Sequence, residues 1–177
     1  VSAFWLIEEI KKRLKKGFKS VENDVLEHLA VGSVKWGMLK FSRESNIAFS
    51  IDESVQIEGN SGPYMQYTYA RTQSLLEKSS KPNLQAKLRE NLDPQLLALA
   101  RVICQFETAL NSAADTFSPN ILSNYLYNLA QKFNQFYERE KIIGSDKEEE
   151  KMILVNGVGM VLKNGLQLLG ISAPKKI

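Results

Sequence analysis

The sequence is poor in the residues that most often carry thiol and metal chemistry, since it contains one cysteine, Cys104, and one histidine, His28. An intramolecular disulfide is therefore excluded, and so is a zinc site with four Cys and His ligands. Cys104 directly follows the apolar pair Val102 and Ile103, which predicts a buried, inert thiol. His28 has no second ligand or nucleophile near it in sequence and is expected to be a surface or capping residue. We predict no metal site and no catalytic residue in this chain.

Charge of one sign and long apolar runs are also scarce. The chain has 23 basic and 20 acidic residues, and a net charge of +3 is too small to establish a polyanionic partner, although it is compatible with one. No run approaches the roughly 18 apolar residues of a membrane span, and the apolar start has no signal-peptide flanks. These absences predict a cytoplasmic protein without a membrane partner. The start at Val1 indicates a piece of a longer chain.

Nucleotide-binding and catalytic patterns are missing as well. Gly157 and Gly159 lie inside a helical pattern, which predicts close helix packing and not a dinucleotide-binding loop. No Ser, His and acid form a recognisable nucleophile arrangement, and no two carboxylates share an apolar run that would raise the pKa of one of them. We expect no cofactor in this chain and no enzymatic activity from the chain by itself.

Helical spacing of apolar residues dominates what is present. It predicts helices over residues 4–14, 21–41, 63–79, 96–104 with a less regular continuation to 117, 119–137 and, after a cap at Asp146, 147–169. Alternation over 47–51 predicts a short extended piece, and the Ser, Lys and Pro residues at 79–83 predict a linker or long loop. With 177 residues, 44% hydrophobic and 24% charged, the chain is expected to form a single all-α helical bundle.

The unusual local feature is a cluster of aromatic residues. Tyr64, Tyr67 and Arg71 are spaced by three and four residues and therefore share one face of the predicted helix over 63–79. Tyrosines beside an arginine can stack on bases and contact phosphate. Periodicity alone favours the alternative that Tyr64 and Tyr67 are interior tyrosines with satisfied hydroxyls. Tyr137 lies at the edge of the apolar stripe in the helix over 119–137.

Four segments of the chain carry a resemblance to a known family. They are residues 30–36 (AVGSVKW), 58–71 (EGNSGPYMQYTYAR), 124–137 (NYLYNLAQKFNQFY) and 162–174 (LKNGLQLLGISAP). In this order they resemble successive helices and the C-terminal ending of the anticodon-binding domain of class I arginyl-tRNA synthetases. The order and the wide coverage make the resemblance specific.

The resemblance implies one all-α anticodon-binding domain over residues 1–177 that grips the anticodon stem-loop of arginine tRNA. It places four side chains near the anticodon, and it assigns loop-shaping and backbone-contact roles to two others. The tRNA-binding residues implied in this way are Tyr64, Tyr67, Tyr137 and Ile177, with Asn60 and Arg71.

Two departures from the family qualify this expectation. The family usually ends in Met, often after Glu-Arg, whereas this chain ends in Lys175, Lys176 and Ile177, which keeps an aliphatic contact without the thioether. The ATP-handling motifs His-Ile-Gly-His and Lys-Met-Ser-Lys-Ser do not occur, so the nucleotide-binding catalytic domain is absent from this chain. The parent enzyme would use ATP to join arginine to its tRNA, and the expected partners are arginine tRNA and that catalytic domain, in a monomer.

Two alternatives remain open. The chain could be a structural or protein-interaction bundle that no longer reads RNA, and the modest net charge of +3 is compatible with this interpretation. A self-contained enzyme is the weakest alternative, because no catalytic constellation supports it.

Overall fold

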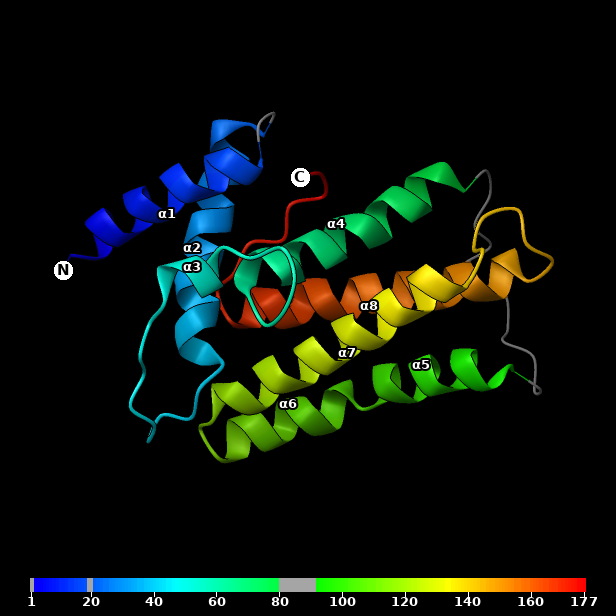
Figure 1. Cartoon of the computed structure of the whole chain (residues 1–177). Coiled ribbons are helices and arrows are strands. Elements are labelled where there is room, and N and C mark those ends of the chain that lie inside the picture. The colour runs from blue at the N-terminus through cyan, green and yellow to red at the C-terminus, as the bar shows by residue number, and fades with distance from the viewer. Residues whose placement is uncertain (1, 19–20, 80–91) are drawn as a thin grey trace.

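A computed structural model describes residues 2–18, 21–79 and 92–177, and within these ranges all regular structure is helical. The helices are α1 Ala3–Gly17, α2 Asn23–Leu39, α3 Ile51–Ser54, α4 Gly62–Lys78, α5 Pro94–Cys104, α6 Phe106–Asp115, α7 Pro119–Arg139 and α8 Glu148–Leu168 (Figure 1). The prediction of an all-α fold is confirmed. Of the predicted linker, Ser79 follows α4, and residues 80–83 lie outside the described residues.

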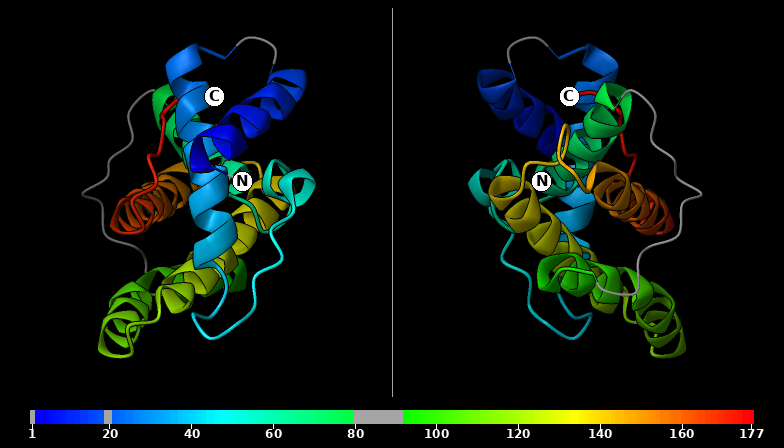
Figure 2. Two further views of the ribbon diagram at one scale, coloured as in Figure 1. Left: turned by 90° about the vertical axis from the view of Figure 1, so that its left-hand side faces the viewer. Right: turned by 90° about the vertical axis from the view of Figure 1, so that its right-hand side faces the viewer.

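The arrangement of the helices is a bundle with a cap at one end. Helix α8 packs against α4, α5 and α7, while α6 packs against α7. Helix α2 crosses α4 at one end of this bundle and carries α1 on its other side (Figure 2). None of the helices in the described part of the chain combines the length and the hydropathy of a bilayer span.

The core follows the apolar stripes that the sequence predicts. Helix α7 buries one complete stripe, formed by Leu122, Leu126, Leu129, Phe133 and Phe136. This stripe and the buried face of α8 belong to one large hydrophobic cluster. A smaller cluster joins α1 to α2 through residues such as Ile10 and Leu29. The cap is thus held by a core of its own.

Helices α2 and α4 approach each other closely where α4 begins. A methyl group added at Gly62 would contact the Gly32 carbonyl oxygen and lie 2.5 Å from its carbonyl carbon. One turn along α4, the buried Gln66 Nε2 donates to the His28 carbonyl at 2.9 Å and to the Ser172 carbonyl at 2.8 Å. The crossing therefore fixes both the direction of α4 and the path of the C-terminal tail, residues 170–177.

The close packing that the sequence predicts at Gly157 and Gly159 concerns α8. A methyl group added at Gly159 would lie 2.7 Å from Thr72 Oγ1 of α4. The interpretation of this glycine as a packing residue is confirmed, because a larger side chain at this position would push α8 away from α4.

One local prediction holds only in part, and another is wrong. Residues 47–50 form no regular structure, with Ser50 in an extended backbone conformation, but Ile51 already begins the single turn α3. Ser50 Oγ caps this turn by accepting from the Glu53 nitrogen at 3.3 Å. Cys104 is exposed and not buried. Helix α5 ends at this residue. The backbone just before Cys104 contacts α7, because the Tyr125 hydroxyl donates to the Val102 carbonyl at 2.9 Å. The thiol is left facing outward.

His28 lies where the sequence predicts it, at the surface. Its side chain is 38% exposed, and its Nδ1 lies 3.9 Å from the Asp24 carboxylate one turn earlier in α2. Among the described residues, no group of three or more His, Cys, Asp and Glu side chains could hold a metal ion.

Candidate nucleic-acid interface

A groove of about 460 Å³ runs between α4, the end of α7 and the C-terminal tail. Its lining includes four of the six predicted site residues, Tyr67, Arg71, Tyr137 and Ile177. They come from three separate segments, and Figure 1 shows the tail beside α4. We call this feature the tyrosine groove. The fold thus brings together residues that lie more than 100 positions apart in the sequence.

Arg71 lies between the two tyrosines of the groove. Its guanidinium carbon lies 5.0 Å from the ring centroid of Tyr67 and 4.6 Å from that of Tyr137, which are cation–π distances. Tyr67 remains 36% exposed and Tyr137 38% exposed. Each ring therefore packs against a cation while a large part of its surface stays open to a planar ligand.

A buried asparagine holds the guanidinium in this place. Arg71 Nη1 donates to Asn134 Oδ1 at 2.6 Å, while Asn134 Nδ2 donates to the Tyr64 hydroxyl at 2.9 Å and to Thr68 Oγ1 at 3.0 Å. Because a guanidinium can only donate, these partners determine which way the amide points. Asn134 is only 9% exposed. The network links α7 to α4 and orients Arg71 toward the groove.

Tyr64 belongs to this interior network and does not line the groove. Its ring meets that of Tyr127 edge-on, with centroids 5.8 Å apart, and its hydroxyl accepts from Asn134 at 2.9 Å. Burial raises the pKa of its phenol. The two tyrosines that the sequence could not separate thus occupy different environments, with Tyr64 half-buried and Tyr67 at the surface.

Asn60 lies outside the groove lining, in the loop before α4. Its Oδ1 accepts from Trp36 Nε1 at 2.7 Å, and its carbonyl accepts from Lys40 Nζ at 2.9 Å. Both donors belong to the end of α2 or the residue after it, so Asn60 ties the loop to α2. At the other end of the site, Ile177 packs against the small α1–α2 cluster while it lines the groove.

The charge around the groove is predominantly positive. Besides Arg71, its lining includes Lys78, Lys175 and Lys176, against one acidic side chain, that of Glu77. Lys176 Nζ lies 3.2 Å from Glu77 Oε2, so this pair neutralises itself. The remaining cations favour an anionic ligand.

Asn134 is the important residue that sequence reasoning missed. The sequence does contain one sign of its role: Asn134 is a polar residue next to Phe133, beside the apolar stripe of α7. A polar side chain that is buried there needs hydrogen-bond partners. Only the fold shows that those partners come from α4.

We expect Asn134→Leu to lower the free energy of unfolding by about 1–3 kcal/mol, since it leaves buried polar groups on α4 without their partner. Urea denaturation should show a lower midpoint with an unchanged m value. Asn128→Leu is the matched control, because Asn128 is an exposed residue of the same helix. Equal midpoints for the two variants would contradict a structural role of the network.

Residues 65–177 match the family described as the DALR anticodon binding domain. The chain belongs to this family. Among curated relatives of this DALR domain, the arginine–tRNA ligase of Fusobacterium nucleatum is 35% identical over 182 residues, covering 99% of this chain and 31% of the relative. That of Ignicoccus hospitalis is 34% identical over 184 residues, covering 98% of this chain and 29% of the relative. The chain thus spans about a third of the length of these relatives.

Solved structures with the same fold are also arginyl-tRNA synthetases. The enzyme of Thermus thermophilus matches with a TM-score of 0.89 at 27% identity, over 100% of this chain and 32% of that chain. The enzyme of Plasmodium falciparum matches with a TM-score of 0.87 at 27% identity, over 100% of this chain and 34% of that chain. The DALR domain described above therefore has the fold of a synthetase anticodon-binding bundle, as the sequence resemblance implies.

Proposed function

We propose that this chain holds the anticodon stem-loop of arginine tRNA in the tyrosine groove. The observation that carries the proposal is Arg71, fixed between the exposed rings of Tyr67 and Tyr137 in a domain whose relatives are arginine–tRNA ligases. The parent enzyme would attach arginine to its tRNA with ATP bound in a separate catalytic domain. We infer that residues 1–177 form one domain of such an enzyme, which works as a cytoplasmic monomer.

Each type of side chain in the groove has its own role in binding the RNA. Unpaired bases of the loop stack on the open sides of Tyr67 and Tyr137, because every base offers a π face. Arg71 contacts a base edge or a phosphate with its remaining donors. Lys78 and Lys175 line the same groove, and their role in this proposal is to contact backbone phosphates, which position the strand without reading its sequence.

Three predicted residues support the groove in other ways. Tyr64 acts through Asn134, which holds Arg71, and therefore does not touch the RNA. Asn60 fixes the loop before α4 and so the start of the helix that carries Tyr67. Ile177 offers the bound loop an aliphatic contact at the groove end.

A filter-binding titration tests the proposal. The chain is titrated with arginine tRNA and with a tRNA of different anticodon at physiological salt, and the arginine tRNA is expected to bind more tightly. Affinity should fall as salt rises, because phosphate contacts release counterions. Equal affinities for the two tRNAs would argue against anticodon readout, and absence of binding to both would favour a bundle that contacts protein.

Tyr137→Ala and Tyr67→Ala should each weaken binding of arginine tRNA by about 1–3 kcal/mol, the value of one base stacked on an aromatic ring. The matched control is Tyr137→Phe, which keeps the ring and should bind like the wild type. Circular dichroism of each variant separates loss of binding from loss of folding. Wild-type affinity in both alanine variants would contradict stacking on these rings.

A further inference from the structure

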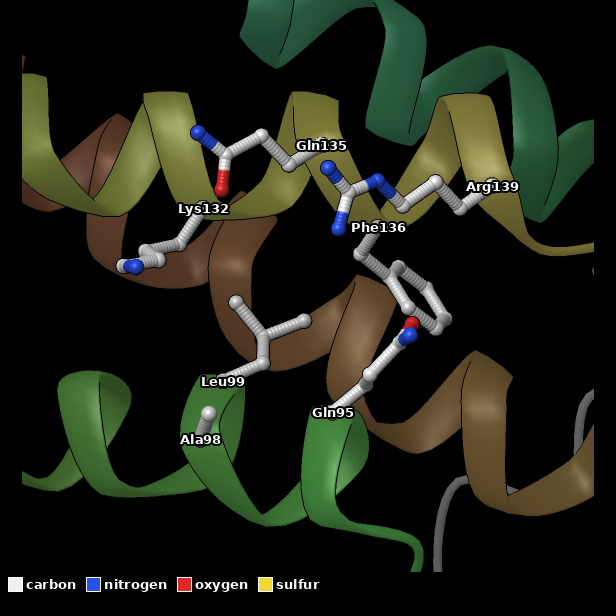
Figure 3. Close-up of a pocket in the computed structure, with 7 residues that line it drawn as sticks. All are labelled: Gln95, Ala98, Leu99, Lys132, Gln135, Phe136 and Arg139. Carbon is white, nitrogen blue, oxygen red and sulfur yellow. The ribbon is translucent and has the colours of Figure 1, made fainter.

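A second groove lies on another side of α7, between this helix and α5, and has a volume of about 180 Å³ (Figure 3). Its floor is apolar, with Leu99 of α5 and the Phe136 ring of α7 facing each other. Its α7 edge carries Lys132, Gln135 and Arg139. Figure 3 shows Gln135 and Arg139 running along α7, while Lys132 extends toward the space between the helices. No acidic residue lines it within the described part of the chain. We call it the α5–α7 groove.

Among the described residues, the two cations of this groove have no acidic partner. In the ranges that the structure describes, no carboxylate lies within the 4.0 Å ion-pair distance of Lys132 or Arg139. Neighbouring lysines behave differently, since Lys147 Nζ lies 3.0 Å from Asp93 Oδ2 and Lys151 Nζ lies 2.9 Å from Glu140 Oε2. Within the described ranges, the α5–α7 groove therefore holds two cations without an acidic partner.

Helix geometry gives these cations a defined spacing. Lys132 and Arg139 are seven residues apart on α7, which is about two turns and about 10 Å along the helix axis. Arg139 lies in the last turn, where the helix dipole alone favours a cation. Lys132 lies mid-helix, where the dipole offers no such reason. An extended anion along α7 would satisfy both charges at once.

We propose that the α5–α7 groove binds backbone phosphates of the same RNA whose loop occupies the tyrosine groove. This inference rests on the proposed function. Tyr137 and Arg139 are two residues apart on α7, and both are exposed. Because two residues turn a helix by about 200°, the two grooves lie on different sides of α7, and an RNA would reach both by passing over the exposed face of this helix, which also carries Glu138. Cations and amides without exposed aromatic rings suit phosphates and not bases. The contact adds affinity and carries no sequence information.

The test uses Lys132→Gln, Arg139→Gln and the double variant in titrations with arginine tRNA over a range of salt. Each single change is expected to weaken binding roughly three- to tenfold at about 0.1 M salt and to reduce the logarithmic salt slope by about 1. The loss should be equal for a tRNA with a changed anticodon. Lys163→Gln is the control, because Lys163 is an exposed lysine of α8 that lines neither groove.

Each outcome decides between the two proposals. Wild-type affinity and slope in the double variant, together with a loss in Tyr137→Ala, would overturn the α5–α7 groove as a phosphate site and leave the proposed function standing. Wild-type binding in both variants would overturn both. Retained tRNA binding with lost binding of poly-glutamate would assign the groove to an acidic peptide and overturn the RNA contact. A smaller slope without a change in anticodon preference supports the proposal.

Discussion

Arg71→Ala is expected to weaken binding of arginine tRNA by about 3 kcal/mol, or about 100-fold, the largest loss in binding of any substitution considered. The change removes the cation that lies 5.0 Å from the Tyr67 centroid and 4.6 Å from the Tyr137 centroid. It therefore loses a charge-assisted contact to the RNA and also the packing that fixes both rings. Filter binding at constant salt measures the loss, and urea denaturation shows whether folding is affected.

Two further variants make this prediction specific. Arg71→Lys keeps the charge but lacks the planar fork that reaches Asn134, so it should recover only part of the affinity. Arg101→Ala removes an exposed arginine of α5 that lines neither groove, and it should bind like the wild type. Equal losses in Arg71→Ala and Arg101→Ala would mean that the tyrosine groove contributes only its general charge.

A double-mutant cycle identifies the role of Asn134. If Asn134 acts by orienting Arg71, Asn134→Leu should weaken binding in the wild type and have little further effect in Arg71→Ala. Additive losses would show that the two residues act independently, in spite of the 2.6 Å hydrogen bond between them.

The sequence predicts the helices well because their signals are local. The apolar stripe of α7 repeats at three and four residues, and the structure buries that stripe. The predictions that fail, wholly or in part, concern positions where tertiary structure decides. Nothing within a few residues of Cys104 shows that α5 ends there and that a new helix turns the thiol outward. Similarly, the alternation over 47–51 cannot reveal that Ile51 begins a helical turn.

In the candidate site, too, local features are predictable from the sequence and long-range contacts are not. The spacing of Tyr64, Tyr67 and Arg71 places them on one face of a helix, but it cannot decide which ring is covered. That outcome depends on Asn134 and Tyr127 of α7, which contact Tyr64 and leave Tyr67 open. The position of the tail is equally non-local, since Gln66 binds the Ser172 carbonyl 106 residues away. Only the family resemblance implies that these distant segments form one site, because the periodicity of the sequence carries local information alone.

The crossing of α2 and α4 is the element on which this arrangement depends. It sets where α4 begins, and Gln66 one turn later holds both α2 and the tail. The tail in turn brings Lys175 and Ile177 to the tyrosine groove. A change that separates α2 from α4 should therefore affect stability and tRNA binding together, whereas a change in the groove itself should affect binding alone.

Gly62→Ala should lower the free energy of unfolding by more than about 3 kcal/mol, because the added methyl meets backbone that cannot rotate away. It would lie 2.5 Å from the Gly32 carbonyl carbon and 2.8 Å from the Ser33 nitrogen, well inside contact distance. Gly17→Ala is the matched control, since a methyl there has no atom within 4 Å and should leave stability unchanged or raise it by up to about 1 kcal/mol. Urea denaturation compares the two variants. A shared midpoint would mean that α2 and α4 can separate without loss, and the close crossing could then not be what positions the tail.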